Sequence, residues 1–151
     1  MTIEEILKAE KPMHIHKKIL LNILVTQQLV NERFLEVLRP FDLSGEQFNV
    51  LRILRGRQGQ PANMCSIQER MLARTSNTTR LVDKLLAKGL VERRVCPQNR
   101  RKMEVTITSR GLDVLEQLDP LVECHDAAYG KSMEVRELEQ LNSLLEKYRT
   151  I

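Results

Sequence analysis

Short polar side chains and two cations follow one another near the middle of the chain, at the expected start of a helix. A helix that begins with small side chains can approach the base edges of duplex DNA closely, and hydroxyl, amide and guanidinium groups hydrogen-bond to those edges. Arg80 and Lys84 lie four residues apart and share one helix face, from which either could reach a guanine edge or a phosphate. The candidate groove contacts of this helix are Ser76, Asn77, Thr78, Thr79, Arg80 and Lys84.

A second basic cluster, Arg100 and Arg101, falls at the tip of a predicted β-hairpin. Arginines at such a tip suit the minor groove of DNA, where a narrow groove concentrates negative potential. The helix start and the hairpin tip would then read neighbouring grooves. Further candidates for contacts with DNA phosphates are Ser66, Arg74 and Arg94.

The 151 residues carry a net charge of +4, but the charge is unevenly distributed. Residues 52–110 hold 14 Lys and Arg against 4 Asp and Glu, a net charge of +10, whereas the rest of the chain nets −6. A segment of one sign raises the electrostatic potential that a polyanion such as DNA experiences. The acidic remainder is a poor surface for DNA and a reasonable one for protein contacts.

Helices are expected to position these residues. Apolar residues recur near a 3.6-residue period over 15–38, which predicts a long amphipathic helix that ends at Pro40. Ser44 and Gln47 have the spacing of a capping box and predict the next helix, which the glycines of 56–59 end. With 3% aromatic residues, the core must be built from aliphatic side chains and methionine, a composition that favours packed helices.

The basic segment is predicted to form two short helices. Ser66 and Glu69 predict a second capping box and a helix through Met71 or Leu72, followed by a turn over 73–75. The following helix begins near Thr75 or Ser76 and ends at Gly89, a natural left-handed cap. Its predicted inward residues are Leu81, Leu85 and Leu86.

A hairpin and two more helices complete the pattern. "LVERRV" and "KMEVTIT" alternate in polarity, with Met103, Val105 and Ile107 on one face and a turn over 97–101. A helix then starts at Thr108 or Ser109 and ends at Gly130; it is either bent or interrupted near Pro120 or one long helix. A last helix spans 135–148. The predicted inward residues of the first of these helices are Leu112, Leu115, and Leu118 or Val122.

A short helix, a turn, a second helix and a basic hairpin form a helix-turn-helix with a wing. Each feature alone also has a structural explanation, since small polar residues cap ordinary helices and paired arginines are often only solvated surface. Their order within one basic segment favours DNA binding. The alternative is a winged-helix protein-interaction module that has lost DNA binding, which a flat response of binding to salt would favour.

Over residues 15–148 the chain resembles MarR-family transcriptional regulators. The resemblance rests on "LSGEQFNVLRIL", "IQERMLARTSNTTRLVDKLLAKGLVERR" and "PQNRRKMEVTITSRG", which fall in the family's order with little insertion. It implies one domain that is mainly α with a small β-hairpin wing, a winged helix-turn-helix over about 44–108 flanked by dimerisation helices over about 13–39 and 109–151. It also implies a homodimer. Two recognition helices related by a two-fold axis would meet successive major grooves, so we expect a roughly palindromic operator. The leading hypothesis is a repressor, with activation at some promoters as the alternative.

The resemblance assigns the helix over 76–88 to the major groove and Arg101 to the minor groove. The family's wing usually carries an aspartate two residues before this arginine, and here that position is Asn99. Asn99 cannot form the ion pair that orients the wing, so we expect either a hydrogen bond in its place or a looser wing and a lower affinity. The loss should be modest, since an exposed ion pair contributes about 0–1 kcal/mol.

The resemblance also implies an effector, because members of the family often respond to small phenolic or other anionic ligands bound between the dimerisation and DNA-binding parts. The sequence identifies no such ligand. We expect no metal site, because His14 and His16 would point to different faces of a helix and His125 lies far along the chain.

Other classes of function find little support. Cys65, Cys96 and Cys124 lack CxxC pairing, so we expect reduced thiols, although basic neighbours leave a redox role for Cys96 open. Paired carboxylates in an apolar setting, a GxSxG elbow, a Walker loop and a Cys/His pair are all missing, so we predict neither an enzyme nor a cofactor. No apolar run approaches the roughly 18 residues that span a bilayer, and no signal peptide is evident, which predicts a cytoplasmic protein.

Overall fold

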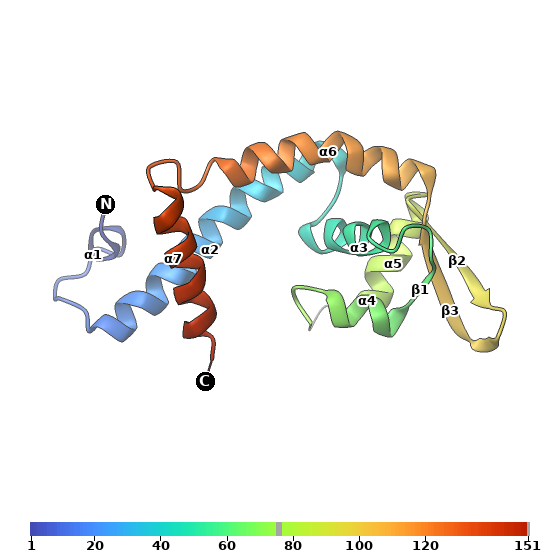
Figure 1. Cartoon of the computed structure of the whole chain (residues 1–151), viewed down its shortest axis with the longest axis horizontal. Helices are drawn as coiled ribbons and strands as arrows, with labels where there is room; N and C mark the ends of the chain where they lie inside the picture. Colours follow the sequence, from blue (N-terminus) through green and yellow to red (C-terminus); the bar gives the residue numbers. More distant parts are fainter. Residues whose placement is uncertain (75–76, 151) are drawn as a thin grey trace.

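The computed structural model describes residues 1–74 and 77–150, and for residues 100 and 101 it describes the backbone alone. The chain is mainly α-helical with one small antiparallel sheet, as predicted (Figure 1). Its elements in chain order are α1 (Ile3–Ile6), α2 (Ile15–Leu38), the 3-10 turn η1 (Arg39–Phe41), α3 (Gly45–Arg55), β1 (Ala62–Asn63), α4 (Met64–Arg70), α5 (Thr78–Ala87), β2 (Val91–Cys96), β3 (Asn99–Ile107), α6 (Ser109–Ala127) and α7 (Val135–Tyr148).

The elements form two parts. We call residues 44–108, with α3, α4, α5 and the sheet, the winged-helix part. We call α2, α6 and α7 the long-helix part; α6 begins beside the sheet and extends away from it along α2 (Figure 1). The core lies mainly in the winged-helix part, with Leu38 at the end of α2, Leu43 and two leucines of α6 as further members. Its fully buried side chains include Val50, Leu51, Leu54, Ile67, Val82, Leu85, Val91, Val105, Leu115 and Leu118.

The structure confirms one predicted helix start and corrects two others. The Ser44–Gln47 capping box of α3 is confirmed, with both of its hydrogen bonds at 3.1 Å. For α4 the predicted box at Ser66 is wrong, because Asn63 is the N-cap and its Oδ1 accepts a 2.8 Å hydrogen bond from the Ser66 amide. Ser66 therefore lies in the first turn, where its hydroxyl donates to the Asn63 carbonyl at 2.9 Å. Helix α5 starts at Thr78, later than predicted, and is capped by Asn77.

The sheet has the strand order β1-β3-β2, all antiparallel. Strands β2 and β3 form the predicted hairpin, with Val91 opposite Ile107 and an irregularity between Val95 and Cys96. The turn is shorter than predicted, because β3 already begins at Asn99. Strand β1 was not predicted; it is two residues long and pairs with the middle of β3. The buried Val105 lies in the central strand, between β1 and β2.

Helix α5, the sheet and α6 meet at one junction. Gly89 ends α5 with a φ of 69°, a conformation that favours glycine, as predicted. Thr108, the N-cap of α6, donates from its hydroxyl to the Gly89 carbonyl at 2.8 Å and from its amide to the Leu90 carbonyl at 3.1 Å. Gly111 packs directly on this backbone, since a Cβ there would stand 2.3 Å from the Leu90 carbonyl oxygen and 2.7 Å from Ile107 Cγ1.

A bidentate ion pair joins α3 to α6. Arg55 donates to both carboxylate oxygens of Asp119, at 2.7 and 2.9 Å. The hydrogen bonds from Arg55 hold the pKa of the Asp119 carboxyl below its usual value, against the opposing effect of burial, and the positive charges of Arg55 and Arg52 lower it further. The same hydrogen bonds raise the pKa of Arg55. The pair therefore holds α6 against α3 at a second point, further along α6 than the junction at its first turn.

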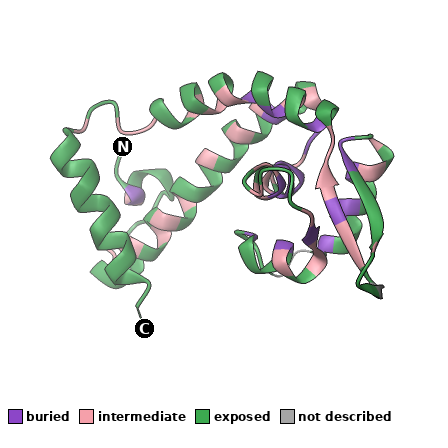
Figure 2. Ribbon diagram, turned by 45° about the vertical axis from the view of Figure 1, so that its right-hand side comes forward, coloured by how far each residue is buried: buried purple, intermediate pink, exposed green. Residues whose placement is uncertain are grey.

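The long-helix part buries little of its apolar surface (Figure 2). Of the 24 residues of α2 only Leu38 is buried, and α7 has no buried residue. Pro120 lies inside α6 without interrupting it, and the predicted inward position of Leu112 is wrong, because Leu112 is 42% exposed. Helix α1, which was not predicted, packs on α2 through the buried Ile3 and a 2.9 Å ion pair between Glu4 and Lys18.

Replacing Gly111 by alanine should destabilise the protein. The added methyl group would overlap the Leu90 carbonyl oxygen and backbone that belong to the junction itself, so the junction must open. We expect a loss of about 1–3 kcal/mol in the free energy of unfolding. Gly45→Ala is the matched control, because a Cβ at Gly45 meets only Phe34 Cε1 at 4.0 Å. Equal urea midpoints for the two variants would show that the close approach is not a constraint.

Replacing Asp119 by asparagine should remove the ion pair with Arg55. Both side chains are partly exposed, so we expect a loss of about 0.5–1 kcal/mol at pH 7. Because the folded pKa of Asp119 lies below the unfolded one, the contribution is present above the unfolded value of about 3.9 and is lost as the pH falls through the folded value. Urea unfolding across this pH range, with Glu116→Gln on the same helix as control, should show the gap closing in acid; a gap independent of pH would contradict the assignment.

Candidate nucleic-acid interface

Helix α5 has one buried face and one charged face. Of the predicted inward residues, Leu85 is fully buried, Leu81 is 8% exposed and Leu86 is half-buried against the core; Val82, which was not predicted, is fully buried as well. The opposite face exposes the side chains of Thr79, Arg80, Asp83 and Lys84. Neither Arg80 nor Lys84 forms an ion pair with another described residue. The structure therefore brings together three of the predicted groove contacts on one solvent-facing surface.

The polar residues at the start of α5 have different roles. Asn77 is the N-cap, and its Oδ1 accepts a 3.1 Å hydrogen bond from the Arg80 amide, so that oxygen is already used in capping. Thr78, also predicted as a groove contact, is 4% exposed, and its hydroxyl has no hydrogen-bond partner among the described residues. Thr78 lies on the same helix face as the buried Leu81, Val82 and Leu85, so its side chain faces the core. Ser76 lies outside the described residues.

The wing carries the second predicted cluster. Residues 100 and 101 belong to β3, directly after the turn at Pro97 and Gln98, and Asn99 is paired in register with Cys96. The positions of the Arg100 and Arg101 side chains lie outside what the structure describes, so their predicted contacts with the minor groove stay predictions. The expected weakening of the wing by Asn99 stays a prediction as well.

The three predicted phosphate contacts differ in availability. Arg94 is 62% exposed and forms a 3.0 Å ion pair with Glu104 across the hairpin, so its guanidinium must leave or share this partner to bind a phosphate. The Ser66 hydroxyl is engaged with the Asn63 carbonyl. Arg74 is exposed in the turn before α5, where its carbonyl accepts a 3.2 Å hydrogen bond from Gln68 Nε2.

Two further basic residues hold α5 in place, and sequence reasoning missed both. Arg93 of β2 forms a 2.8 Å ion pair with Asp83 on α5. Lys88 follows the last turn of α5. Its Nζ donates to the backbone carbonyl of Asp42, forms an ion pair with the Asp42 carboxylate and lies 3.5 Å from Gln47 Oε1. Gln47 is itself 4% exposed at the start of α3. Their partners lie at sequence separations of 10, 46 and 41, which no local pattern reveals.

An apolar groove lies in the long-helix part. It has a volume of about 900 Å³ and runs between α2, the end of α6 and α7. Its lining includes Ile19, Ile23, Val30, Phe34, Leu141, Leu144, Leu145 and Tyr148. At its end the His125 ring lies 5.2 Å from the Phe34 ring, and Nε2 of His125 is 3.3 Å from the Val30 carbonyl. The α7 leucines of this lining are 40–55% exposed in the single chain.

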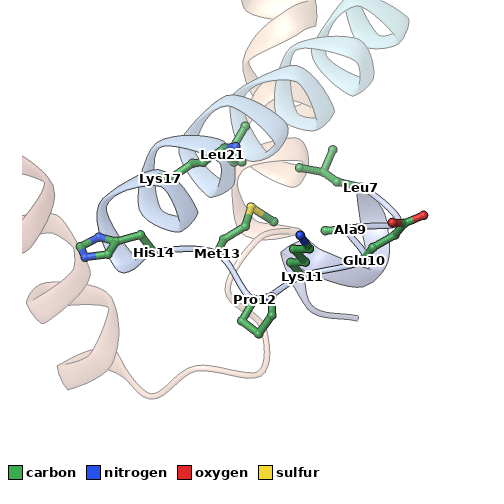
Figure 3. Close-up of a pocket in the computed structure, with 9 residues that line it drawn as sticks. All are labelled: Leu7, Ala9, Glu10, Lys11, Pro12, Met13, His14, Lys17 and Leu21. Carbon is green, nitrogen blue, oxygen red and sulfur yellow. The ribbon is translucent and has the colours of Figure 1, made fainter.

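A smaller cavity lies between residues 7–13, which we call the N-terminal arm, and the start of α2. It measures about 720 Å³, and its lining combines apolar Leu7, Met13 and Leu21 with basic Lys11 and Lys17. Glu10 and His14 lie at opposite ends of it (Figure 3). The cavity belongs to the long-helix part, not to the boundary with the winged-helix part where an effector was expected.

The residues considered for metal or redox chemistry are dispersed. The rings of His14 and His16 stack at 5.3 Å, contrary to the expectation that they diverge, because His14 is the extended N-cap of α2 and not a helical residue. Among the described residues no three potential metal ligands gather. Cys65, Cys96 and Cys124 are unpaired thiols. Within the described ranges, no helix is both long and apolar enough to cross a bilayer.

Comparison with known proteins adds to this geometry. Residues 43–103 match the sequence profile described as "MarR family". The chain is 31% identical to a MarR transcription factor from Planctomyces limnophilus, over 90% of this chain and 98% of that one, with a TM-score of 0.68. It is 26% identical to a mutant MarR from E. coli solved with operator DNA, over 91% and 99% of the two chains, with a TM-score of 0.77.

BpsR of Bordetella bronchiseptica, described for the regulation of its DNA binding by 6-hydroxynicotinic acid, shares the fold. Its identity is 20%, its TM-score 0.80, and the match covers 93% of this chain and 99% of that one. The winged helix-turn-helix, the exposed basic face of α5 and the 31% identity over nearly the whole chain agree with one another. The chain belongs to the MarR family of transcription regulators.

Proposed function

We propose that the chain is a sequence-specific DNA-binding repressor that acts as a homodimer on a roughly palindromic operator. The observation that carries the proposal is the face of α5, where Thr79, Arg80 and Lys84 are exposed while the opposite face is anchored in the core. Such a helix can enter a major groove while its buried face stays packed on the core. The 26%-identical E. coli MarR solved with operator DNA supports this reading.

In this proposal the polar residues of the interface have separate tasks. Thr79 and the side-chain NH2 group of Asn77 contact base edges, and Arg80 and Lys84 contact guanine edges or phosphates. Arg74 and Arg94 contribute phosphate contacts, and Arg100 and Arg101 reach the minor groove. Arg93 and Lys88 position α5 through their ion pairs and do not contact DNA directly.

The apolar groove of the long-helix part supports a homodimer. A second copy would cover the exposed leucines of α7 and α2, since exposed apolar side chains that gather on one face mark surfaces for protein contacts. A two-fold axis would place two copies of α5 in successive major grooves, about 34 Å apart. This spacing requires an operator with two inverted half-sites.

An effector is the less specific part of the proposal. The cavity beside the N-terminal arm joins apolar side chains to Lys11 and Lys17, a combination that suits a small phenolic or other anionic ligand. The related fold of BpsR, whose DNA binding 6-hydroxynicotinic acid regulates, supports a ligand of this class. Operator affinity that is unchanged across a panel of small aromatic acids would argue against it.

The proposed function is tested by selection of bound duplexes from a random DNA pool, followed by titration of the best duplex across a range of salt. We expect a palindrome whose affinity falls steeply with salt, because each neutralised phosphate releases counterions. Failure to enrich any sequence would overturn the proposal in favour of a protein-interaction module.

Variants of α5 make this test specific to the interface. Arg80→Ala should weaken operator binding and, if the side chain contacts a phosphate, reduce the magnitude of the salt slope by about one unit per half-site. Lys131→Ala removes the same charge in the turn after α6, away from α5, and should leave the slope unchanged. Equal effects of the two variants would mean that only net charge matters.

Leu144→Glu should convert the homodimer to a monomer. Leu144 lines the groove and is 55% exposed in the single chain, so a second copy would bury a carboxylate there without a partner. Ser143→Glu is the control, because the adjacent residue does not line the groove. Sedimentation should give the monomer mass for the first variant and the dimer mass for the second. A dimer mass for Leu144→Glu would place the interface elsewhere.

A further inference from the structure

Leu72 is an apolar side chain displayed to solvent on the basic part of the molecule. It lies in the turn between α4 and α5 and is 93% exposed, whereas the preceding Met71 is 4% exposed. The other large apolar side chains described between residues 44 and 108 are buried or half-buried, except Val95 of the wing at 50%. The exposed position of Leu72 is therefore exceptional within this part of the chain.

The turn holds Leu72 outward on a fixed support. Met71 anchors its N-terminal side in the core, and the Met71 amide donates to the Gln68 carbonyl at 3.2 Å. The side chain of Gln68 then spans the turn and donates to the Arg74 carbonyl at 3.2 Å. Both sides of the turn are thus tied to α4 while Leu72 is exposed, so its side chain contributes almost no burial free energy in the single chain.

The surroundings of Leu72 select the chemistry of its partner. Arg70 and Arg74 are exposed on either side of it in the sequence, and Thr79 and Arg80 of the first turn of α5 follow a few residues further along the chain. Residues 52–110 carry a net charge of +10, and this one-sign charge around Leu72 favours a polyanion as its partner. A polyanion that also presents an apolar group fits both features.

The major groove of DNA presents one such group, the C5-methyl of thymine, which apolar side chains contact. We propose that Leu72 packs against a thymine methyl at the edge of the major groove and thereby selects thymine at one position of each half-site. The inference rests on the proposed function, since it requires α5 to lie in that groove. Leucine has no hydrogen-bonding group, so this selection depends on the methyl group alone.

Single-methyl substitution tests the proposal. Each thymine of the selected operator is replaced by deoxyuridine, symmetrically in both half-sites, which removes the C5-methyl and keeps every hydrogen-bonding group. At one position the wild-type protein should lose about fourfold in affinity per half-site, or about fifteenfold for the pair, which is the effect of one buried methyl-sized group. Leu72→Ala should bind the thymine and deoxyuridine operators at that position equally well.

Val95→Ala is the matched control, because it truncates the other exposed apolar side chain of the winged-helix part and should retain the full thymine preference. Wild-type protein that binds the operator but is indifferent to the methyl at every position would overturn the role of Leu72 and leave the proposed function standing. A Leu72→Ala variant that keeps the preference would do the same. Failure of the wild type to bind any operator would instead overturn the proposed function.

Discussion

The architecture depends on the close approach of Gly111 to the Leu90 backbone. At this point the end of α5, the first residue pair of the hairpin and the first turn of α6 share the carbonyls of Gly89 and Leu90. Every side chain larger than hydrogen at 111 would separate these three elements. Since α5 carries the candidate groove contacts and the hairpin carries the wing, the junction sets the angle between them. The same junction, with the Arg55–Asp119 pair, fixes both relative to α6.

The two parts of the chain are stabilised differently. The winged-helix part has its own buried core, to which α6 contributes Leu115 and Leu118. The long-helix part keeps its apolar groove open and leaves much of α2 and α7 in contact with water. The proposed second copy would cover this groove and complete an apolar core in the long-helix part. Folding of the long-helix part would then be coupled to association, and operator affinity would depend on protein concentration.

Local signals in the sequence predicted most of the fold. The long amphipathic period gave both ends of α2, the Ser44–Gln47 box gave the start of α3, and Gly89 gave the end of α5. The errors arose where two local signals competed or where the signal was too short. Asn63 and Ser66 are both good caps three residues apart, and the first one in the chain caps α4. Strand β1 has only two residues, so no alternation could reveal it.

The chemistry of the interface was predictable, but the assignment of its charges was not. Composition shows that residues 52–110 are basic, yet four of these cations, Arg55, Lys88, Arg93 and Arg94, are paired with carboxylates in the described structure. Three of these pairs link separate elements and one crosses the hairpin, so these cations hold elements together. On the exposed face of α5 itself, the cations that form no ion pair with a described residue are Arg80 and Lys84. A high number of basic residues in a segment therefore does not by itself give a strong local electrostatic potential, because the fold decides which of them are paired with carboxylates.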